Sequence, residues 1–173
     1  MLFKVGEKVV YPNQGVGEIR EISCKAIMGR EEEFYMLRIL SNNSTVMIPV
    51  TNVENVGLRR LCSEKDLQSL FKVLESSDYE TELDWKNRYK ENVEKMKTGS
   101  IVEVGHVLQN LYFLSITKPL SFREKKMYDR ARQLVISEIS TVRRESETAV
   151  EESVEGMLSQ AYERHTEATQ VAG

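Results

Sequence analysis

The stretch Lys8–Ser23, KVVYPNQGVGEIREIS, sets the character of the first part of the chain. It holds two short β-rich runs, KVVY and VGEIREIS, on either side of a turn that contains Pro12 and Gly15. Two further runs, FYMLRIL and STVMIPV, follow with the same kind of punctuation. Because valine, isoleucine and tyrosine favour strands while glycine and proline interrupt them, the spacing predicts a small, strongly bent sheet or barrel over residues 1–60.

The run STVMIPV, residues 44–50, is expected at an edge of this sheet. Pro49 lacks the backbone N–H that a residue in a central strand donates to a neighbouring strand, so it favours an edge position. Apolar residues occur on both faces of this run and of EEFYMLRIL, residues 32–40. A fully buried strand and an edge strand with an outside partner would each explain that pattern.

From Leu61 onward the patterning changes to helical. Residues 61–144 predict four helices, and residues 145–173 an acidic fifth. The predicted starts are Ser63 with Asp66, a position near Asp84, Ser100 with Glu103, and Ser121 with Glu124, the clearest capping box. Short connections between helices indicate a compact bundle. The expected fold class is therefore α+β, with a β domain at 1–60, a helical domain at 61–144 and an acidic helix and tail at 145–173.

The net charge of −3 is unevenly distributed. Residues 1–60 carry a net charge of +1, residues 61–144 carry +2, and residues 145–173 carry −6. Local charge governs local binding, so the acidic total does not exclude a nucleic-acid partner for the first two regions.

The residue patterns of known catalytic and metal sites are missing. His106 and His165 lie far apart in the sequence, Cys24 and Cys62 form no CxxC pair, and there is no nucleophile elbow. We therefore expect no enzymatic activity, no metal and no cofactor. The first residues, MLFKVGEKVVYPN, are too charged for a signal peptide, and no run approaches a membrane span. We expect a cytoplasmic protein without membrane contact.

The segment Leu83–Lys90, LDWKNRYK, surrounds the single tryptophan with three cations. At 100° per residue, Trp85 shares one apolar stripe with three later residues of its helix, namely Tyr89, Val93 and Met96. That stripe favours a core tryptophan. Lysines and arginines frame the stripe on both sides, however, and Trp85 lies in the first turn, where a helix end can protrude. Both a core role and a contact role remain open on this pattern.

A second basic run, FREKKMYDRAR at residues 122–132, begins the fourth helix of the predicted bundle. By itself it reads as a solvated helix face. If the two basic helix starts lay side by side, they would form one positive surface with an aromatic residue at its edge. Such a surface suits a DNA backbone together with a wedge inserted between base pairs.

Three blocks together resemble the CarD/CdnL family of bacterial RNA polymerase-binding transcription regulators. They are FKVGEKVVYPNQGVGEI at 3–19, LDWKNRYKENVEKMKTG at 83–99, and LSFREKKMYDRARQLV at 120–135. The resemblance extends over residues 1–144. It implies a Tudor-like N-terminal domain that docks on the polymerase β subunit and a helical domain that contacts promoter DNA. Members stabilise the open complex by placing a tryptophan in the minor groove at the upstream edge of the bubble, with weak sequence preference.

The resemblance also implies which residues act. For DNA these are Trp85 as the wedge and the cations Lys86, Arg88, Lys90, Lys125 and Lys126, while Asn87 departs from a basic family position. For RNA polymerase they are Lys25, Met47, Ile48 and Pro49. Lys25 and Met47 stand where some members have arginine, and a methionine on an edge strand can instead fill an apolar pocket.

The sequence therefore predicts a monomeric, non-enzymatic transcription regulator that bridges RNA polymerase and promoter DNA. The alternative is a protein–protein interaction adaptor that docks through the same edge strand and makes no direct DNA contact. The two differ in their salt dependence, because several phosphate contacts weaken steeply with ionic strength.

Overall fold

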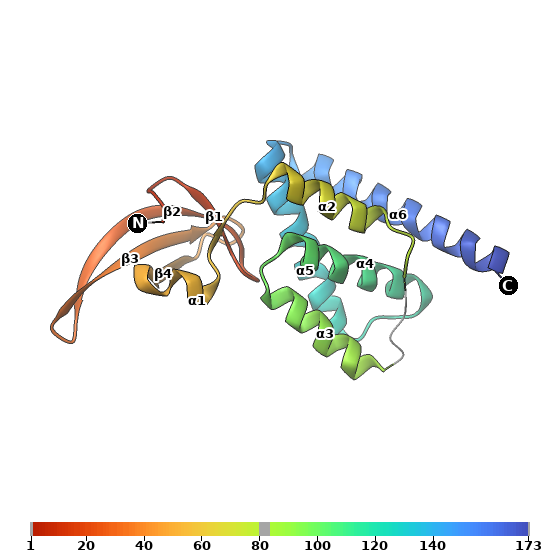
Figure 1. Cartoon of the computed structure of the whole chain (residues 1–173), viewed down its shortest axis with the longest axis horizontal. Helices are drawn as coiled ribbons and strands as arrows, with labels where there is room; N and C mark the ends of the chain where they lie inside the picture. Colours follow the sequence, from red (N-terminus) through yellow and green to blue (C-terminus); the bar gives the residue numbers. More distant parts are fainter. Residues whose placement is uncertain (1, 80–83, 173) are drawn as a thin grey trace. The chain divides into compact units, whose positions relative to one another are not determined.

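The computed structural model describes residues 2–79 and 84–172. The chain divides into two compact units, Met1–Leu61 and Cys62–Gly173. The first unit contains the β sheet and the second is built from helices (Figure 1). The predicted α+β fold class is confirmed, and the division lies beside the predicted change of texture at residue 61.

Among the described residues, the first unit holds one five-stranded antiparallel sheet in the order β4-β3-β2-β1-β5. The strands are β1 (Lys8–Tyr11), β2 (Gly15–Ile27), β3 (Arg30–Ile39), β4 (Thr45–Pro49) and β5 (Arg59–Arg60). Two short helical segments, η1 (Val50–Asn52) and α1 (Val53–Val56), connect β4 to β5. Each turn follows from glycine, proline or asparagine at its bend, as the sequence pattern predicts.

One face of the sheet carries the core of the first unit. Ile19, Tyr35, Leu37 and Ile48 are almost completely buried there, and the backbone N–H of Phe3 donates a hydrogen bond of 3.1 Å to the Tyr35 hydroxyl. A register shift in β2 after Ile19 marks the irregularity expected of a strongly bent sheet.

The second unit consists of α2 (Glu64–Glu75), α3 (Trp85–Lys97), α4 (Ile101–Thr117), α5 (Phe122–Arg143) and α6 (Glu147–Ala172). This agrees with the predicted bundle of about five helices. Ser63 and Asp66 form a complete capping box at the start of α2. Gly99, with a φ of 73°, follows the end of α3 in the left-handed conformation expected of a helix stop.

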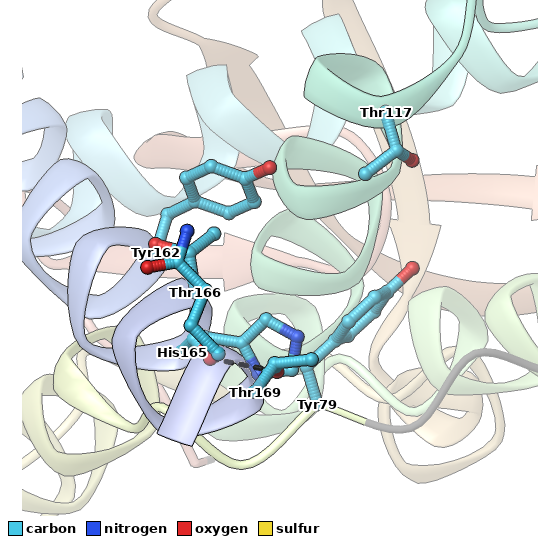
Figure 2. Close-up of a pocket in the computed structure, with 7 residues that line it drawn as sticks. Tyr79, Thr117, Tyr162, His165, Thr166 and Thr169 are labelled. Carbon is cyan, nitrogen blue, oxygen red and sulfur yellow. Dashed lines mark hydrogen bonds between the residues drawn. The ribbon is translucent and has the colours of Figure 1, made fainter. Parts of the chain in front are cut away.

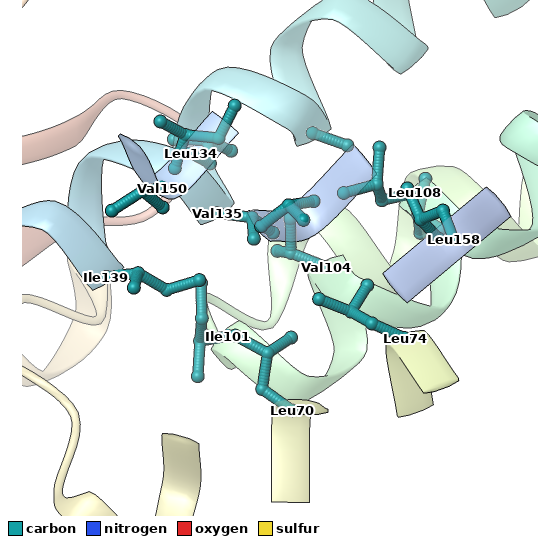
Figure 3. Close-up of a cluster of buried hydrophobic side chains, with 14 of the residues drawn as sticks. Leu70, Leu74, Ile101, Val104, Leu108, Leu134, Val135, Ile139, Val150 and Leu158 are labelled. Carbon is teal, nitrogen blue, oxygen red and sulfur yellow. The ribbon is translucent and has the colours of Figure 1, made fainter. Parts of the chain in front are cut away.

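The core of the second unit lies where α2, α4, α5 and α6 meet. Figure 3 shows aliphatic side chains from all four helices converging, among them Leu70, Leu108, Val135 and Leu158. Gly105 lets α2 and α4 approach closely, because a Cβ there would lie 2.4 Å from Cδ1 of Leu70.

Helix α6 is part of this core, so the acidic helix predicted within residues 145–173 packs with the other helices in one unit. Its buried residues recur along one side of the helix and are Val150, Val154, Leu158 and Ala161. The acids face outward, and Glu151 and Glu155 pair with Arg132 of α5. The acidic composition concealed a narrow apolar stripe. No helix in the described ranges, 2–79 and 84–172, has the length and apolar character that crossing a bilayer requires.

Candidate functional site

Helix α3 turns a partly polar face toward its neighbours. Its buried residues are Arg88, Asn92 and Met96, which recur every four residues and so lie on one side of the helix. The predicted apolar stripe from Trp85 through Tyr89 is therefore wrong in its orientation, because the helix is rotated so that Trp85 is exposed and Tyr89 is half-buried. An arginine, Arg88, faces inward at this end of the helix in place of the apolar residues that helical periodicity favours.

Arg88 is buried because it has a buried partner. Its Nε lies 3.0 Å from Oε2 of Glu124 and its Nη2 lies 3.3 Å from Oε1, so the pair is bidentate. The two side chains are 7% and 5% exposed. Glu124 belongs to the first turn of α5, so this ion pair joins the start of α5 to the start of α3. An unpaired charge here would be costly, and the pairing explains the orientation of α3.

The prediction that Arg88 contacts DNA is not supported by this position. A guanidinium that is nearly inaccessible and bound to a carboxylate cannot also reach a phosphate in this structure. Glu124, predicted to form a capping box with Ser121, donates its backbone N–H to the Ser121 hydroxyl, and its carboxylate accepts hydrogen bonds from both that hydroxyl and Arg88. No local sequence pattern predicts that these two residues meet.

Trp85 is the first residue of α3 and its side chain is 49% exposed. The interpretation as a core tryptophan is therefore wrong. Asp84 caps the helix, since its Oδ1 accepts a hydrogen bond of 3.0 Å from the backbone N–H of Lys86. Lys86 and Lys90 are both exposed. Leu83, which opens the quoted tryptophan segment, lies outside the described residues.

The first turn of α5 presents a matching set of groups. Phe122, its first residue, is 74% exposed, and Nζ of Lys126 lies 4.6 Å from the centroid of the phenyl ring. Arg123 and Lys125 are exposed beside it. The ion pair between Arg88 and Glu124 holds the starts of α3 and α5 side by side. The two basic segments therefore belong to neighbouring helical turns.

We call this the aromatic-basic surface, defined by Trp85, Lys86, Lys90, Phe122, Arg123, Lys125 and Lys126. Within the described ranges, none of its lysines pairs with a carboxylate. Helix N-termini carry partial positive charge, which adds to these side chains. The lysines can form ion pairs with phosphates, and the two exposed aromatic rings can stack on an apolar or aromatic partner.

The residues predicted for polymerase docking lie in the first unit. Strand β4 is an edge, as predicted, because the sheet order ends there and β4 pairs with β3 alone among the described strands. Met47 is 43% exposed and Pro49 is half-buried, both on the face opposite the core. The side chain of Ile48 points into the core, so a partner could reach its backbone but not its side chain. Lys25 is exposed near the far end of β2, opposite Glu32.

A separate pocket of about 330 Å³ lies where the last turns of α6 approach the end of α4. Figure 2 shows Tyr79, Tyr162 and His165 around it. Nδ1 of His165 lies 2.9 Å from the carbonyl oxygen of Ser77, and its ring packs near Phe113. These contacts fasten the end of α6 to the bundle and assign His165 a structural role.

Comparison with known proteins identifies the family. Residues 69–155 match the family model of the CarD C-terminal domain, and residues 3–62 match that of the CarD-like/TRCF RID domain. The chain belongs to the CarD/CdnL family. It is 32% identical over 142 residues to the "Putative transcription factor YdeB" of Bacillus subtilis (strain 168), which covers 82% of this chain and 93% of that protein. The family consists of transcription factors, and its RID domain is an RNA polymerase-interacting domain.

Two solved structures of N-terminal domains are also similar. "CdnLNt" from Myxococcus xanthus is 48% identical and covers 37% of this chain and 90% of that chain, with a TM-score of 0.32. The solution structure of the N-terminal domain of Myxococcus xanthus CarD is 36% identical and covers 34% and 77%, with a TM-score of 0.30. The N-terminal sheet of this CarD/CdnL protein lies within residues 3–62, which match the CarD-like/TRCF RID domain.

Sequence reasoning missed Phe122 and the buried partner of Arg88. Phe122 carried a usable signal, because an aromatic residue directly after a capping serine and directly before basic residues repeats the pattern of Trp85. The pairing of Arg88 with Glu124 carried none, since it joins two helices that are far apart in the sequence.

Proposed function

We propose that this CarD/CdnL protein docks on the β subunit of RNA polymerase and stabilises the promoter open complex through its aromatic-basic surface. The observation that supports this most strongly is the exposure of Trp85 at a helix start that a buried ion pair holds in place. A large ring that is fixed, exposed and surrounded by cations is suited to insertion beside a phosphate backbone.

The wedge acts on DNA that is already opening. Separating two stacked base pairs costs on the order of a few kcal/mol, and less where the duplex is melting. The ring of Trp85 regains part of that cost through stacking and through loss of its contact with water. The wedge therefore binds the edge of a melted region more tightly than it binds an intact duplex.

The phosphate contacts come from exposed lysines rather than from Arg88. Lys86 and Lys90 extend from α3, and Lys125 and Lys126 from α5, so the two helix starts can hold two parts of the backbone. Arg88 acts one layer beneath, where it fixes the helix that carries Trp85. These contacts supply affinity without base readout, which agrees with weak sequence preference.

The effect on transcription follows from the difference between two affinities. A ligand shifts a two-state equilibrium only by the ratio of its affinities for the two states. A difference of about 1.4 kcal/mol between open and closed promoter changes their ratio about tenfold. Docking on polymerase raises the local concentration of the surface near the promoter, so weak binding to free DNA is sufficient.

The β4 edge is the docking surface in this proposal. An edge strand presents unpaired backbone groups that can extend a partner's sheet, and side chains on alternate residues give specificity. Met47 is the exposed apolar side chain of β4, while Ile48 contributes backbone only. Lys25 lies on another strand, so we expect it to make a separate, peripheral contact.

The DNA part can be tested directly because Trp85 is the single tryptophan. Titration with a duplex that has one melted end should quench its fluorescence at lower DNA concentration than titration with the fully paired duplex. Lys90→Ala should shift both titrations to higher concentration without removing the difference between them. Equal responses to the two DNAs, or no response, would contradict the wedge and favour the adaptor.

The docking part requires a matched pair of variants. Met47→Glu places a charge on the β4 edge, whereas Met28→Glu places one at the β2–β3 turn, where Met28 is 99% exposed. We expect Met47→Glu to lose β-subunit capture in a pull-down and Met28→Glu to retain it. Retention by both, with intact folds, would remove β4 from the interface.

A further inference from the structure

Phe122 stays outside the core even though a neighbouring residue enters it. Leu120 packs against the hydrophobic core of the second unit and so anchors the segment that leads into α5. Phe122, two residues later, is 74% exposed, more than Trp85. Burial of a phenyl ring is normally favourable, so a largely exposed phenylalanine in a well-formed helix indicates a contact surface when other features support it.

The position of Phe122 relative to Trp85 provides the second feature. Arg88 is three residues after Trp85, and Glu124 is two residues after Phe122, so each ring begins within one helical turn of the ion pair, about 5 Å along its axis. Side chains lean toward the N-terminus of a helix. Both rings therefore project from helix starts that the ion pair joins, and Phe122 lies on the side of α5 away from Glu124, about 200° around the helix axis.

The surroundings of the ring provide the third feature. Lys126 lies over the phenyl ring, with Nζ 4.6 Å from the centroid, and Arg123 and Lys125 flank it. A ring with cations around it is poorly suited to an apolar protein pocket, since the charges would have to lose water as well. It suits a nucleotide, whose base stacks on the ring while its phosphates meet the cations.

We propose that Phe122 is a second aromatic contact with DNA, which stacks on an unpaired base of the opened region that Trp85 enters. This inference rests on the proposed function and extends it from one ring to two. Trp85 separates a base step, and Phe122 holds a base that has already left the duplex. The division of labour makes the surface selective for a junction between paired and unpaired DNA.

The test compares substitutions at Phe122 in the full chain, with binding to the melted-end duplex measured by fluorescence anisotropy. Because the ring would lose its stacking contact with a base, Phe122→Ala should weaken binding roughly tenfold. Phe122→Leu should weaken it similarly, because it keeps apolar bulk without a ring, and Phe122→Tyr should bind like the wild type. Binding to the fully paired duplex should change little. Val171→Ala, at an exposed apolar residue of α6, serves as the control.

The outcomes separate this inference from the proposed function. If Trp85→Ala weakens binding while Phe122→Ala does not, the second contact is wrong and the proposed function stands. If neither changes binding to any DNA, both fail. Full binding by Phe122→Leu would overturn the stacking role, and loss of polymerase capture by Phe122→Ala with unchanged DNA binding would show a protein contact instead.

Discussion

Substitution of Glu124 in its buried pair with Arg88 should affect DNA affinity in two opposite ways, through the loss of a negative charge and through the loss of the contact that positions α3. Glu124→Gln removes one negative charge from beneath the proposed DNA-binding surface. If electrostatics alone governed binding, the variant would hold phosphates more tightly. If the pair positions α3, the variant leaves a buried guanidinium without this carboxylate, and DNA binding should weaken.

The magnitude follows from burial and geometry. Both side chains are less than 10% exposed and the pair makes two hydrogen bonds, at 3.0 and 3.3 Å. Removal of one member of such a pair costs about 3–5 kcal/mol, and the amide retains some hydrogen bonding, so we take the lower end. The inner face of this end of α3 consists of the polar residues Arg88 and Asn92. Little hydrophobic burial is therefore available to hold the helix start in place once the ion pair is lost. About 3 kcal/mol raises the population with a detached helix start roughly a hundredfold.

Two measurements on one set of variants test this reasoning. Hydrogen exchange of the α3 amides should accelerate up to roughly a hundredfold in Glu124→Gln, while the core amides of α4 keep their protection. Affinity for the melted-end duplex should fall. Arg88→Met combined with Glu124→Gln removes both charges and should recover protection and affinity in part. Unchanged α3 exchange together with tighter DNA binding would refute the positioning role and return Arg88 to the phosphate contacts.

Three other predictions follow. The logarithm of DNA affinity should fall with the logarithm of salt concentration, and Lys90→Ala should reduce that slope by about 1, whereas an unchanged slope would remove the lysine from the phosphate contacts. Burial, aided by the charge of Lys95, lowers the pKa of His106 in the folded protein. As pH falls, the His106 imidazole is therefore protonated in the unfolded chain at a higher pH than in the folded protein. The melting temperature should fall as pH decreases below about 6.5, and His106→Gln should reduce that dependence; an identical profile would exclude His106 as its source. Gly105→Ala should lower the free energy of unfolding by about 1–3 kcal/mol in denaturant titrations, because its Cβ would overlap Leu70, and an unchanged value would mean that the helices separate freely.

The sequence was a good guide wherever local patterns determine structure. Strand runs, helix starts and the stop at Gly99 depend on residues close together in the chain, and the structure has them where the pattern predicts. The edge position of β4 was also predictable, because Pro49 cannot take part in a central ladder.

The errors arose where distant residues meet. The rotation of α3 depends on Glu124, thirty-six residues beyond Arg88, and no periodicity within α3 reveals it. The helical periodicity by itself favoured a core position for Trp85 and placed Arg88 beside the apolar stripe, whereas the structure exposes Trp85 and buries Arg88. Helix α6 was underestimated for a different reason, since its many acids obscured a stripe of apolar residues wide enough to pack.

The lifetime of open complexes tests the central claim most directly. Complexes of RNA polymerase with a promoter would be challenged with a competitor, with and without this protein, and the decay followed for the wild type, Trp85→Ala and the control Val171→Ala. The account predicts that the wild type and Val171→Ala prolong the lifetime, and that Trp85→Ala loses the effect while remaining folded and bound to polymerase. An equal prolongation by Trp85→Ala would contradict the account.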